Sequence, residues 1–424
     1  MTVVNSTEMV PIVASAPGKI IIFGEHSAVY GKPAMAASVS SLRSYLYVKK
    51  TEDESVVEMA FPDINSNYSW PHKDLEEIDR QQLTLAQESN DVNNYVMEFV
   101  RSQVSGKGSD LEQQAAVCFL YLYMCLCPNL KGVRFILKST LPIGAGLGSS
   151  ASIAVCLALA MAKLGGHLDA ESKELSSSDL EFVNKWSFIA EKCNHGTPSG
   201  IDNAVATYGN AVVFRRQEDG STTFEPIKEF PQVPMVLTNT KIPKSTKVLV
   251  ANVRKLFERE PVITSTILEA MSAVATKAKE LLPAISSDPK RYTEMLELVR
   301  INHGLLVSLG VSHPGLEVIK SLSDSTGIGS TKLTGAGGGG CAFTLLKTGT
   351  TDEAVTSFIE TLSKNHGYES FTTELGGLGC CFVAPDSLAA HASEIAKLFE
   401  EESTIEELNN ALLPGSSALN WVVS

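Results

Sequence analysis

A glycine-rich segment that runs directly into an apolar helix constrains this chain more than any other feature. Glycines alternate with apolar residues at positions 144, 146 and 148, two serines follow, and an alanine-rich apolar run extends from Ile153 to Leu164. Glycine lets the backbone turn tightly and approach a ligand closely. A helix that begins after such a turn directs free N–H groups and the positive end of its dipole at the turn. The segment therefore predicts an anion site, most often one for phosphate.

The alternative is an ordinary helix start, because a glycine turn followed by a serine N-cap also begins helices that bind nothing. The segment is not a Walker-type P-loop, since no lysine precedes the hydroxyl residue. It is not a dinucleotide-binding fingerprint either, since the G-x-G-x-x-G spacing is absent. Taken alone, the segment leaves phosphate binding and a plain helix start both open.

Composition supports a large folded protein without a general affinity for polyanions. The chain has 424 residues, of which 44% are hydrophobic, and its formal net charge is −13. At roughly 150 residues per domain, this length predicts two or three domains. Because nucleic acids and anionic membranes attract clusters of Lys and Arg, the acidic balance predicts neither as a partner. An anionic small molecule would need local cations and backbone N–H groups.

The cysteines and the N-terminal residues favour a reducing compartment. Eight cysteines are scattered without a C-x-x-C pair, which disfavours a zinc site. Most lie in apolar runs, as the buried thiols of a cytosolic protein do. Residues 1–13 lack a basic segment followed by an apolar one, and no apolar run reaches about 18 residues. The sequence therefore predicts a cytoplasmic protein without a secretory signal or a membrane span.

Residue patterns predict mixed strands and helices with a division near the middle of the chain. The expected elements are strands within 12–50, a loop with a surface helix over 51–110, a buried helix over 115–127, a strand over 133–137, a helix from the Ser178–Glu181 capping box to about Lys192, a strand over 210–214, and helices from 246 to about 309. Prolines at 226, 231 and 234 mark a link between domains. We therefore expect one domain over 1–225 and a second over 226–424.

A lysine and an acid–histidine pair accompany the first apolar strand. Lys19 follows a Pro-Gly pair that places a bend before it, and Glu25 and His26 follow a glycine at the strand end. Lys19 is either a functional cation or an edge-strand lysine whose stem covers apolar surface. Glu25 and His26 are either site residues or parts of a solvated turn.

Two carboxylates follow the first glycine segment. Glu191 lies in an otherwise apolar part of its helix, where a carboxylate must be paired or bind a cation. Asp202 lies between Ile201 and an Ala-Val-Ala run. It is either a functional carboxylate or the N-cap of a short helix.

A second glycine cluster occupies residues 335–340, with four glycines in succession. Such a run costs much backbone entropy on folding. It is favoured where side chains would collide with a ligand or with another part of the backbone. A flexible surface turn is the alternative, which is disfavoured because Cys341–Leu346 has the pattern of a buried strand.

Three glycine motifs in this order resemble those of the GHMP kinase superfamily. They are Pro17–Lys19, Pro142–Ser152 and Lys332–Cys341, and the most specific further matches are Gly24–Gly31 and His195–Gly209. Within the superfamily, the chain is similar to the branch that phosphorylates mevalonate, in its fungal type. The resemblance implies an α+β fold with two domains. The N-terminal domain would resemble domain 2 of ribosomal protein S5, the C-terminal domain would combine an antiparallel sheet with helices, and ATP would lie in the cleft between them.

The resemblance also implies roles for individual residues. Asp202 would be the catalytic base, and Lys19 would hold Asp202 and the substrate hydroxyl. Glu25, His26 and Thr246 would lie near mevalonate. The residues implied to contact ATP are Lys19, Ser139, Gly144, Ala145, Gly146, Leu147, Gly148, Ser149 and Ser150. The residues implied to bind Mg²⁺ are Ser150 and Glu191. The loop implied to close the site contains Gly335, Ala336, Gly337 and Gly338.

The implied activity is ATP-dependent phosphorylation of the primary hydroxyl of mevalonate to 5-phosphomevalonate, an early step of isoprenoid and sterol biosynthesis. Mg²⁺ would be the cofactor, the protein would be a homodimer, and isoprenyl diphosphates would inhibit it by feedback. One departure from the family pattern is Asp63, which stands where some relatives carry an asparagine that contacts the nucleotide.

Two other functions stay open at this point. The chain could be another GHMP kinase, acting on phosphomevalonate, homoserine or a sugar, although the Glu25–His26 pair favours mevalonate. It could also be a sensor that keeps the fold and has lost turnover. A sensor would be expected to lack Lys19, Glu191 or Asp202, and the chain has all three.

Overall fold

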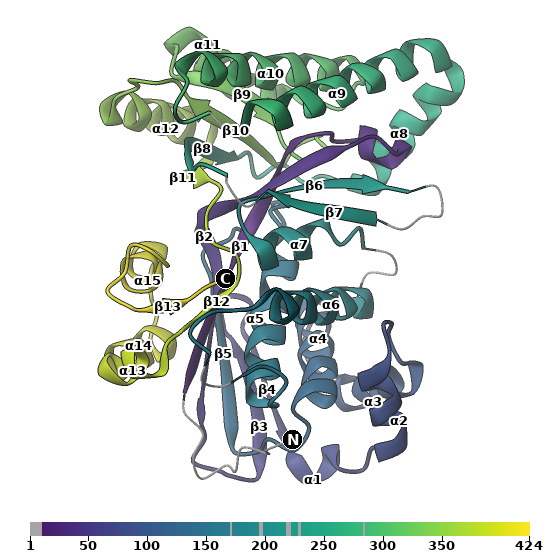
Figure 1. The fold of residues 1–424 in the computed structure, drawn as a ribbon, viewed down its shortest axis with the longest axis vertical. Coiled ribbons are helices and arrows are strands. Elements are labelled where there is room, and N and C mark those ends of the chain that lie inside the picture. Colours follow the sequence, from purple (N-terminus) through teal and green to yellow (C-terminus); the bar gives the residue numbers. More distant parts are fainter. Residues whose placement is uncertain (1–10, 170–171, 195–197, 218–221, 228–229, 283–284) are drawn as a thin grey trace.

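One continuous sheet carries both halves of the chain. The structure is a computed structural model that describes residues 11–169, 172–194, 198–217, 222–227, 230–282 and 285–424. Its strands are β1 Ile12–Phe23, β2 Ala34–Lys50, β3 Val56–Phe61, β4 Ser66–Pro71, β5 Val133–Ser139, β6 Ala211–Arg216, β7 Thr222–Ile227, β8 Val233–Asn239, β9 Gly329–Leu333, β10 Cys341–Leu346, β11 Glu369–Leu375, β12 Cys381–Val383 and β13 Trp421–Val422. The main path follows the order β13-β12-β1-β2-β11-β8-β10-β9. Figure 1 shows the long strands β1 and β2 running from the lower half of the molecule into the upper half.

Helices cover this sheet in three groups. They are α1 His72–Leu75, α2 Arg80–Glu88, α3 Asn94–Val104, α4 Asp110–Leu126, α5 Ser149–Leu164, α6 Ser177–Asn194, α7 Ile201–Tyr208, α8 Thr246–Arg259, α9 Pro261–Leu281, α10 Pro289–Ser308, α11 Pro314–Thr326, α12 Asp352–His366, α13 Pro385–Ala390, α14 Ala392–Glu400 and α15 Ile405–Leu412, with short 3₁₀ turns η2 Ser27–Tyr30 and η3 Pro62–Ile64. Figure 1 places α2 to α6 in the lower half, α8 to α12 in the upper half, and α13 to α15 to the left of the sheet. This is the mixed, two-part architecture that the sequence predicts.

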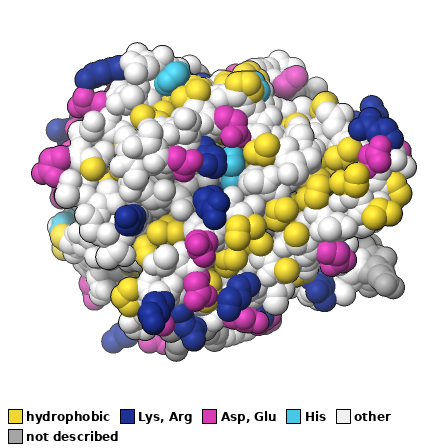
Figure 2. Space-filling model, turned by 90° about the horizontal axis from the view of Figure 1, so that it is seen from above, with side chains coloured by type: hydrophobic (Ala, Val, Ile, Leu, Met, Phe, Trp, Pro, Cys, Tyr) yellow, Lys and Arg dark blue, Asp and Glu magenta, His cyan; other side chains and the backbone are white. Residues whose placement is uncertain are grey.

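The upper half buries one face of its helices and exposes another. Val274, Met295 and Val299 of α9 and α10 pack with sheet residues in one core cluster. On α9, by contrast, Val262 and Ile263 are 76% and 60% exposed. Figure 2 views the molecule from this end and shows hydrophobic side chains gathered in a band toward the right of the view. Large exposed apolar patches often mark surfaces at which a protein binds a partner.

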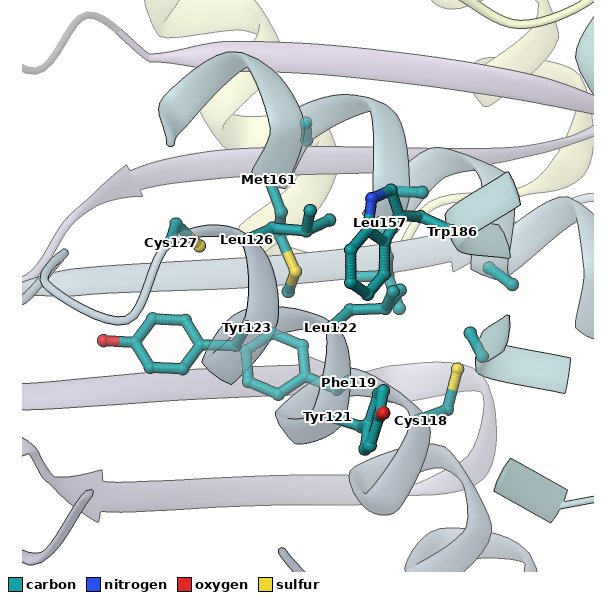
Figure 3. Close-up of a cluster of buried hydrophobic side chains, with 14 of the residues drawn as sticks. Cys118, Phe119, Tyr121, Leu122, Tyr123, Leu126, Cys127, Leu157, Met161 and Trp186 are labelled. Atoms are coloured by element: carbon teal, nitrogen blue, oxygen red, sulfur yellow. The ribbon is translucent and has the colours of Figure 1, made fainter. Parts of the chain in front are cut away.

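The lower half has a core of aromatic and sulfur-containing side chains. Helix α4 begins where Ser109 and Glu112 form a capping box, and it ends before Pro128. Its side chains meet those of α5 and α6, as Figure 3 shows. The residues labelled there are Cys118, Phe119, Tyr121, Leu122, Tyr123, Leu126, Cys127, Leu157, Met161 and Trp186. This packing confirms the predicted buried helix and holds α5, which follows the first glycine segment, in place.

Residues 51–110 are more ordered than the sequence indicates. The expected loop with one surface helix is wrong, because the segment forms the β3–β4 hairpin and helices α1, α2 and α3. In β4, Tyr68 and Trp70 alternate with exposed residues, and Trp70 stacks on Phe119 of α4 with the ring centroids 5.6 Å apart. Polar residues between the aromatic ones, and prolines at the strand ends, hide this alternation in the sequence.

The capping box of α6 lies earlier than predicted. The hydroxyl oxygen of Ser176 accepts from the backbone N–H of Asp179 at 3.2 Å, and the Asp179 carboxylate accepts from the Ser176 N–H at 2.9 Å. The helix therefore begins at Ser177. Both Ser176 and Ser178 precede an acidic residue by three positions, so the sequence alone fits either start.

The predicted link between domains begins inside a strand. β7 pairs antiparallel with β6, placing Pro226 opposite Val212, and β8 begins at Val233. The division of the chain at residue 225 stays a prediction. The chain also returns to its first half at the end, since β12 pairs with β1 and β13 pairs with β12.

The cysteines agree with the expected chemistry. All eight are free and buried. Burial raises the pKa of Cys341 to about 12, which leaves its thiol protonated and unreactive at neutral pH. Among the described residues, the helices are too short or too polar for any of them to cross a membrane.

Candidate active site

Lys19 and Asp202, which are far apart in the chain, meet in space. Lys19 Nζ lies 3.2 Å from Asp202 Oδ1, and it donates to the carbonyl oxygen of Gly146 at 3.2 Å. The Lys19 side chain is 8% exposed, whereas that of Asp202 is 38% exposed. The ammonium group is therefore fixed between a carboxylate and the first glycine segment. The carboxylate itself remains open to an incoming molecule.

An irregularity in β1 brings Lys19 to this position. The register between β1 and β2 shifts after Pro17 while β1 continues through the Pro-Gly pair, so the predicted bend takes the form of an irregularity within a continuous strand. The backbone N–H of Lys19 then donates to Leu147 O at 2.8 Å. A Cβ on Gly18 would lie 2.9 Å from that same carbonyl oxygen. Glycine at position 18 therefore permits the strand and the glycine segment to touch. Lys19 is not the edge-strand lysine of the alternative interpretation.

The first glycine segment presents its backbone outward. Gly144, Gly146 and Gly148 have φ values of 73°, 81° and 76°, while Ala145 and Leu147 between them are buried. Gly148 is the N-cap of α5, so the first turn of that helix has free N–H groups next to an exposed glycine surface. Asp202, by contrast, is not an N-cap, since Gly200 holds that position in α7. The arrangement suits an anion that contacts backbone N–H groups.

A substitution at Gly148 tests whether close packing at this position is needed to place Lys19 and Asp202. A Cβ at position 148 would lie 3.1 Å from Lys19 Cγ and 3.6 Å from Asp202 Cβ, and φ is positive. We expect Gly148→Ala to lower kcat about tenfold by displacing Lys19, beyond the stability cost of about 1 kcal/mol that a positive φ imposes. Gly327→Ala is the matched control, because its φ is 69° and its Cβ would meet open space. Equal kcat values for the two variants, measured at saturating substrate concentrations, would contradict the expectation.

Ser150 and Glu191 come together at the start of α5. The Ser150 hydroxyl donates to the Glu191 carboxylate, and Glu191 is buried. Both groups offer oxygen atoms, the ligands that Mg²⁺ prefers, and a magnesium site of this kind keeps waters and substrate phosphates as its other ligands. Among the described residues, no group of three or more His, Cys, Asp or Glu side chains is suited to a metal. The donor set therefore fits a Mg²⁺ ion that arrives with a nucleotide.

The second glycine cluster packs against backbone, as the sequence predicts. A Cβ on Gly337 would lie 2.0 Å from Val311 O, and one on Gly339 would lie 2.6 Å from Ile242 O. The amide of Gly338 donates to Val311 O at 2.8 Å. The glycines are thus needed for close contact between chain segments, and the loop is no flexible turn.

Lys244 is a site residue that the sequence analysis missed. Its Nζ lies 3.0 Å from the place where a Cβ would stand on Gly146 and 2.5 Å from that on Gly340, so it bridges the two glycine loops. Burial lowers its pKa, and the nearby charge of Lys19 lowers it further. The signal in the sequence is that Lys244 directly precedes the α8 N-cap Ser245, where the helix dipole disfavours a cation. A lysine in that place is useful when an anion binds beside it.

The three residues expected near mevalonate have different surroundings. His26 Nε2 donates to the carbonyl oxygen of Ala336 at 2.9 Å, which ties it to the second glycine loop. Glu25 is buried, and its carboxylate pairs with Lys332 and Asn302. Burial raises the pKa of Glu25, although Lys332 opposes that shift. Thr246 is the exposed first residue of α8.

Ser139 and Asp63 contact each other at the end of β5. The backbone N–H of Ser139 donates to Asp63 Oδ2 at 2.8 Å, and the Ser139 hydroxyl accepts from the N–H of Leu141 at 3.2 Å. Burial raises the pKa of Asp63. Ser139 thus lies at the strand end that leads into the first glycine segment. Residues 195–197, part of the stretch that contributes to the family resemblance, lie outside the described residues.

Comparisons with known proteins identify the family of this chain. The chain matches the family models for the GHMP kinases N terminal domain over residues 113–210 and for GHMP kinases C terminal over residues 278–365. It is 48% identical to the mevalonate kinase of Saccharomyces cerevisiae, over 97% of this chain and 99% of that protein. It is 46% identical to the mevalonate kinase of Candida albicans, over 87% of this chain and 89% of that protein.

A solved structure extends the likeness to three dimensions. The L. major mevalonate kinase in complex with R-mevalonate has a TM-score of 0.59 and 25% identity, over 85% of this chain and 94% of that chain. The fold is therefore the two-domain fold that the glycine motifs imply. Given near-half identity over almost the full length, the chain belongs to the mevalonate kinase family of the GHMP kinases.

Proposed function

We propose that this protein transfers the γ-phosphoryl group of ATP to the primary hydroxyl of mevalonate, giving 5-phosphomevalonate and ADP. The observation that carries the proposal is the Lys19–Asp202 pair at 3.2 Å, held against the first glycine segment with the carboxylate open. Relatives of nearly half identity are named mevalonate kinases, and a similar solved structure holds R-mevalonate. Both support mevalonate as the substrate.

In this mechanism, the mevalonate hydroxyl oxygen attacks the γ-phosphorus, the bond from that phosphorus to the ADP oxygen breaks, and Asp202 accepts the hydroxyl proton. The hydroxyl is roughly 12 pKa units less acidic than a carboxyl group, taking water as its proxy. Asp202 therefore takes the proton late, as the loose transition state collapses onto the attacking oxygen. Lys19 stabilises the negative charge that develops on that oxygen. Positioning and charge neutralisation supply most of the acceleration.

Mg²⁺ bound with the nucleotide would neutralise charge on the phosphates, and Ser150 and Glu191 would hold it. The exposed glycine backbone at 144–148 would contact the triphosphate through N–H groups, and Ser149 begins the helix that points its N-terminus at the same place. Ser139, beside Asp63, would contact the nucleotide farther from the reacting phosphate. The second glycine loop, with His26 attached to Ala336, would close over mevalonate.

Lys244 would neutralise phosphate charge from between the two loops, and this gives a pH prediction. The cationic form binds the anion, and burial lowers the pKa of this lysine in the free protein. As pH rises through that lowered pKa, the charge is lost, so kcat/KM for ATP falls at a lower pH than a surface lysine would give. Lys244→Arg keeps its charge and should move this alkaline limb upward. Lys244→Met should lower kcat/KM about 10- to 100-fold. If the alkaline limb of kcat/KM for ATP lay at the same pH in Lys244→Arg as in the parent, Lys244 would not be the cation that binds the phosphates.

The experiment that tests the proposed function is coupled ADP release with a panel of alcohols. The panel contains mevalonate, phosphomevalonate, homoserine and galactose, each with ATP and Mg²⁺. Turnover with mevalonate alone would support the proposal. Turnover with another alcohol in place of mevalonate would show that this alcohol is the substrate. Nucleotide binding without any turnover would indicate a sensor.

The wider biology forms part of the same proposal. A cytoplasmic enzyme of sterol synthesis fits the eight free, buried thiols. Isoprenyl diphosphates, as competing anions, would bind the first glycine segment and inhibit. The exposed apolar side chains of α9 support a homodimer, and sedimentation at a single subunit mass would contradict it.

A further inference from the structure

A buried polar cluster joins the end of β1 to the strand before the second glycine loop. Lys332 of β9 donates through Nζ to Glu25 Oε1 and to Leu333 O, the latter at 2.8 Å. Asn302 of α10 donates through Nδ2 to Glu25 Oε2 at 3.1 Å. The side chains of Lys332 and Glu25 are 0% and 1% exposed. Burying such a pair is costly, and it persists only while both partners remain together.

Glu25 is buried and held by these contacts. Each of its carboxylate oxygens already accepts from a donor of the upper half, one from Lys332 and one from Asn302. Because the Glu25 side chain is 1% exposed, a substrate could reach the carboxylate only if the residues around it moved apart. Separating Glu25 from Lys332 would leave a buried charge unpaired, and separating it from Asn302 would leave a buried N–H donor unpaired. Glu25 is therefore suited to holding structure in place and poorly suited to binding a ligand directly.

Residues next to Glu25 and Lys332 in the chain make further contacts that extend toward the candidate active site. The Thr334 hydroxyl donates to Ile21 O at 2.9 Å and accepts from the Ile21 N–H at 3.0 Å. His26, the neighbour of Glu25, donates to Ala336 O at 2.9 Å. His26 has φ 60° and ψ −44°, a strained conformation for a residue other than glycine. Such strain persists only where neighbouring contacts hold the residue in place. The Glu25–Lys332 pair is adjacent to His26 and supplies such a contact.

We propose that Lys332 is a positioning residue for phosphoryl transfer: by holding Glu25, it fixes His26 and the Gly335–Gly340 loop relative to Lys19. The same strand β1 carries Lys19 and Ile21, so a displacement of the loop from β1 is a displacement from the reacting groups. A misplacement of about 1 Å at a reacting centre costs about 100-fold in rate. The kinetic part of this inference rests on the proposed function, whereas the placement of the loop does not.

The test compares three variants of the full-length protein: Lys332→Met, Glu25→Gln and the double variant. Lys364→Met and Glu360→Gln serve as matched controls, because that pair makes the same kind of contact on the exposed surface of α12. For each protein, kcat and the two KM values are measured by ADP release with mevalonate. Hydrogen exchange of the amides in residues 333–341 is measured without substrate.

We expect each single variant to lower kcat about 10- to 100-fold while both KM values stay within about threefold. The double variant should be no slower than the slower single variant, because both changes remove one and the same contact. The amides of 333–341 should exchange at least about tenfold faster than in the parent. The controls should match the parent in all these measurements.

Three results would overturn the inference. The first is parental kcat in Lys332→Met. The second is a raised KM for mevalonate in Glu25→Gln alone, which would make Glu25 a substrate ligand. The third is rate losses that multiply in the double variant. If Lys332→Met does not fold, Glu25→Met combined with Lys332→Met leaves no stranded charge, and parental kcat in that folded protein would equally overturn the inference.

The outcomes for the loop and for the proposed function are distinguishable. Failure of the parent protein to phosphorylate mevalonate would refute the proposed function. Exchange of residues 333–341 would still decide whether Lys332 holds the loop, since that measurement needs no turnover. Parental exchange rates in all three variants would refute the positioning role even in an active kinase.

Discussion

Replacing Asp202 with alanine is expected to lower kcat by about 10²- to 10⁴-fold, the contribution of a well-placed general base. The carboxylate lies 3.2 Å from Lys19 and is the one acidic group that the structure places beside both Lys19 and Gly148 among the described residues. Binding of ATP should persist, because the glycine backbone, Ser150 and Glu191 remain. Loss of a negative charge near the triphosphate should leave the ATP affinity equal or higher.

Two measurements decide this prediction. Coupled ADP release gives kcat, and calorimetric titration with Mg²⁺-ATP gives the affinity. Asp386→Ala is the matched control, since Asp386 is also the second residue of a short helix, α13, and is exposed. The control removes the same helix-dipole contact and should keep parental kcat. Turnover of Asp202→Ala within tenfold of the parent would exclude Asp202 as the base.

The sequence predicts elements well where apolar residues form a continuous run. The apolar runs that became α4 and α5 are continuous, and their starts are fixed by local signals, a capping box at Ser109 and a glycine at position 148. β4 fails this test, because Tyr68 and Trp70 are separated by polar residues in a segment rich in them. Its partner strand, which makes the hairpin stable, is not visible from local composition.

The site shows the same division between local and tertiary information. The glycine segments, Lys19, Glu191 and Asp202 were found because their residue types are unusual for their surroundings. Their meeting in space depends on how β1 passes between the two halves, which no spacing in the sequence reveals. Lys244 and Lys332 were missed for this reason. Each looks like an ordinary lysine until the fold places Gly340 beside one and Glu25 beside the other.

Loss of Arg43 should lower the stability of the fold strongly. Its guanidinium group is buried and donates to Ser15 Oγ at 2.8 Å, Leu378 O at 2.8 Å and Gly379 O at 2.7 Å. These bonds clamp the segment by which the chain crosses back to its first half before β12. All three acceptors are neutral, so the planar fork of the arginine, with several donors in fixed directions, is what satisfies them.

We expect Arg43→Met to lower the free energy of unfolding by about 3–5 kcal/mol, because two buried acceptors and one partly buried acceptor lose their donor at about 1–3 kcal/mol each. Relief of the buried charge offsets part of that sum, which keeps the loss toward the lower end. Urea unfolding followed by fluorescence measures the change. Arg134→Met is the control, since Arg134 in the neighbouring strand β5 makes a partly exposed contact with Glu58 at 3.6 Å and should cost less than about 1 kcal/mol. Equal losses in the two variants would show that the returning segment is held by its apolar contacts, with Phe382 and Val422 in the core, and not by the Arg43 clamp.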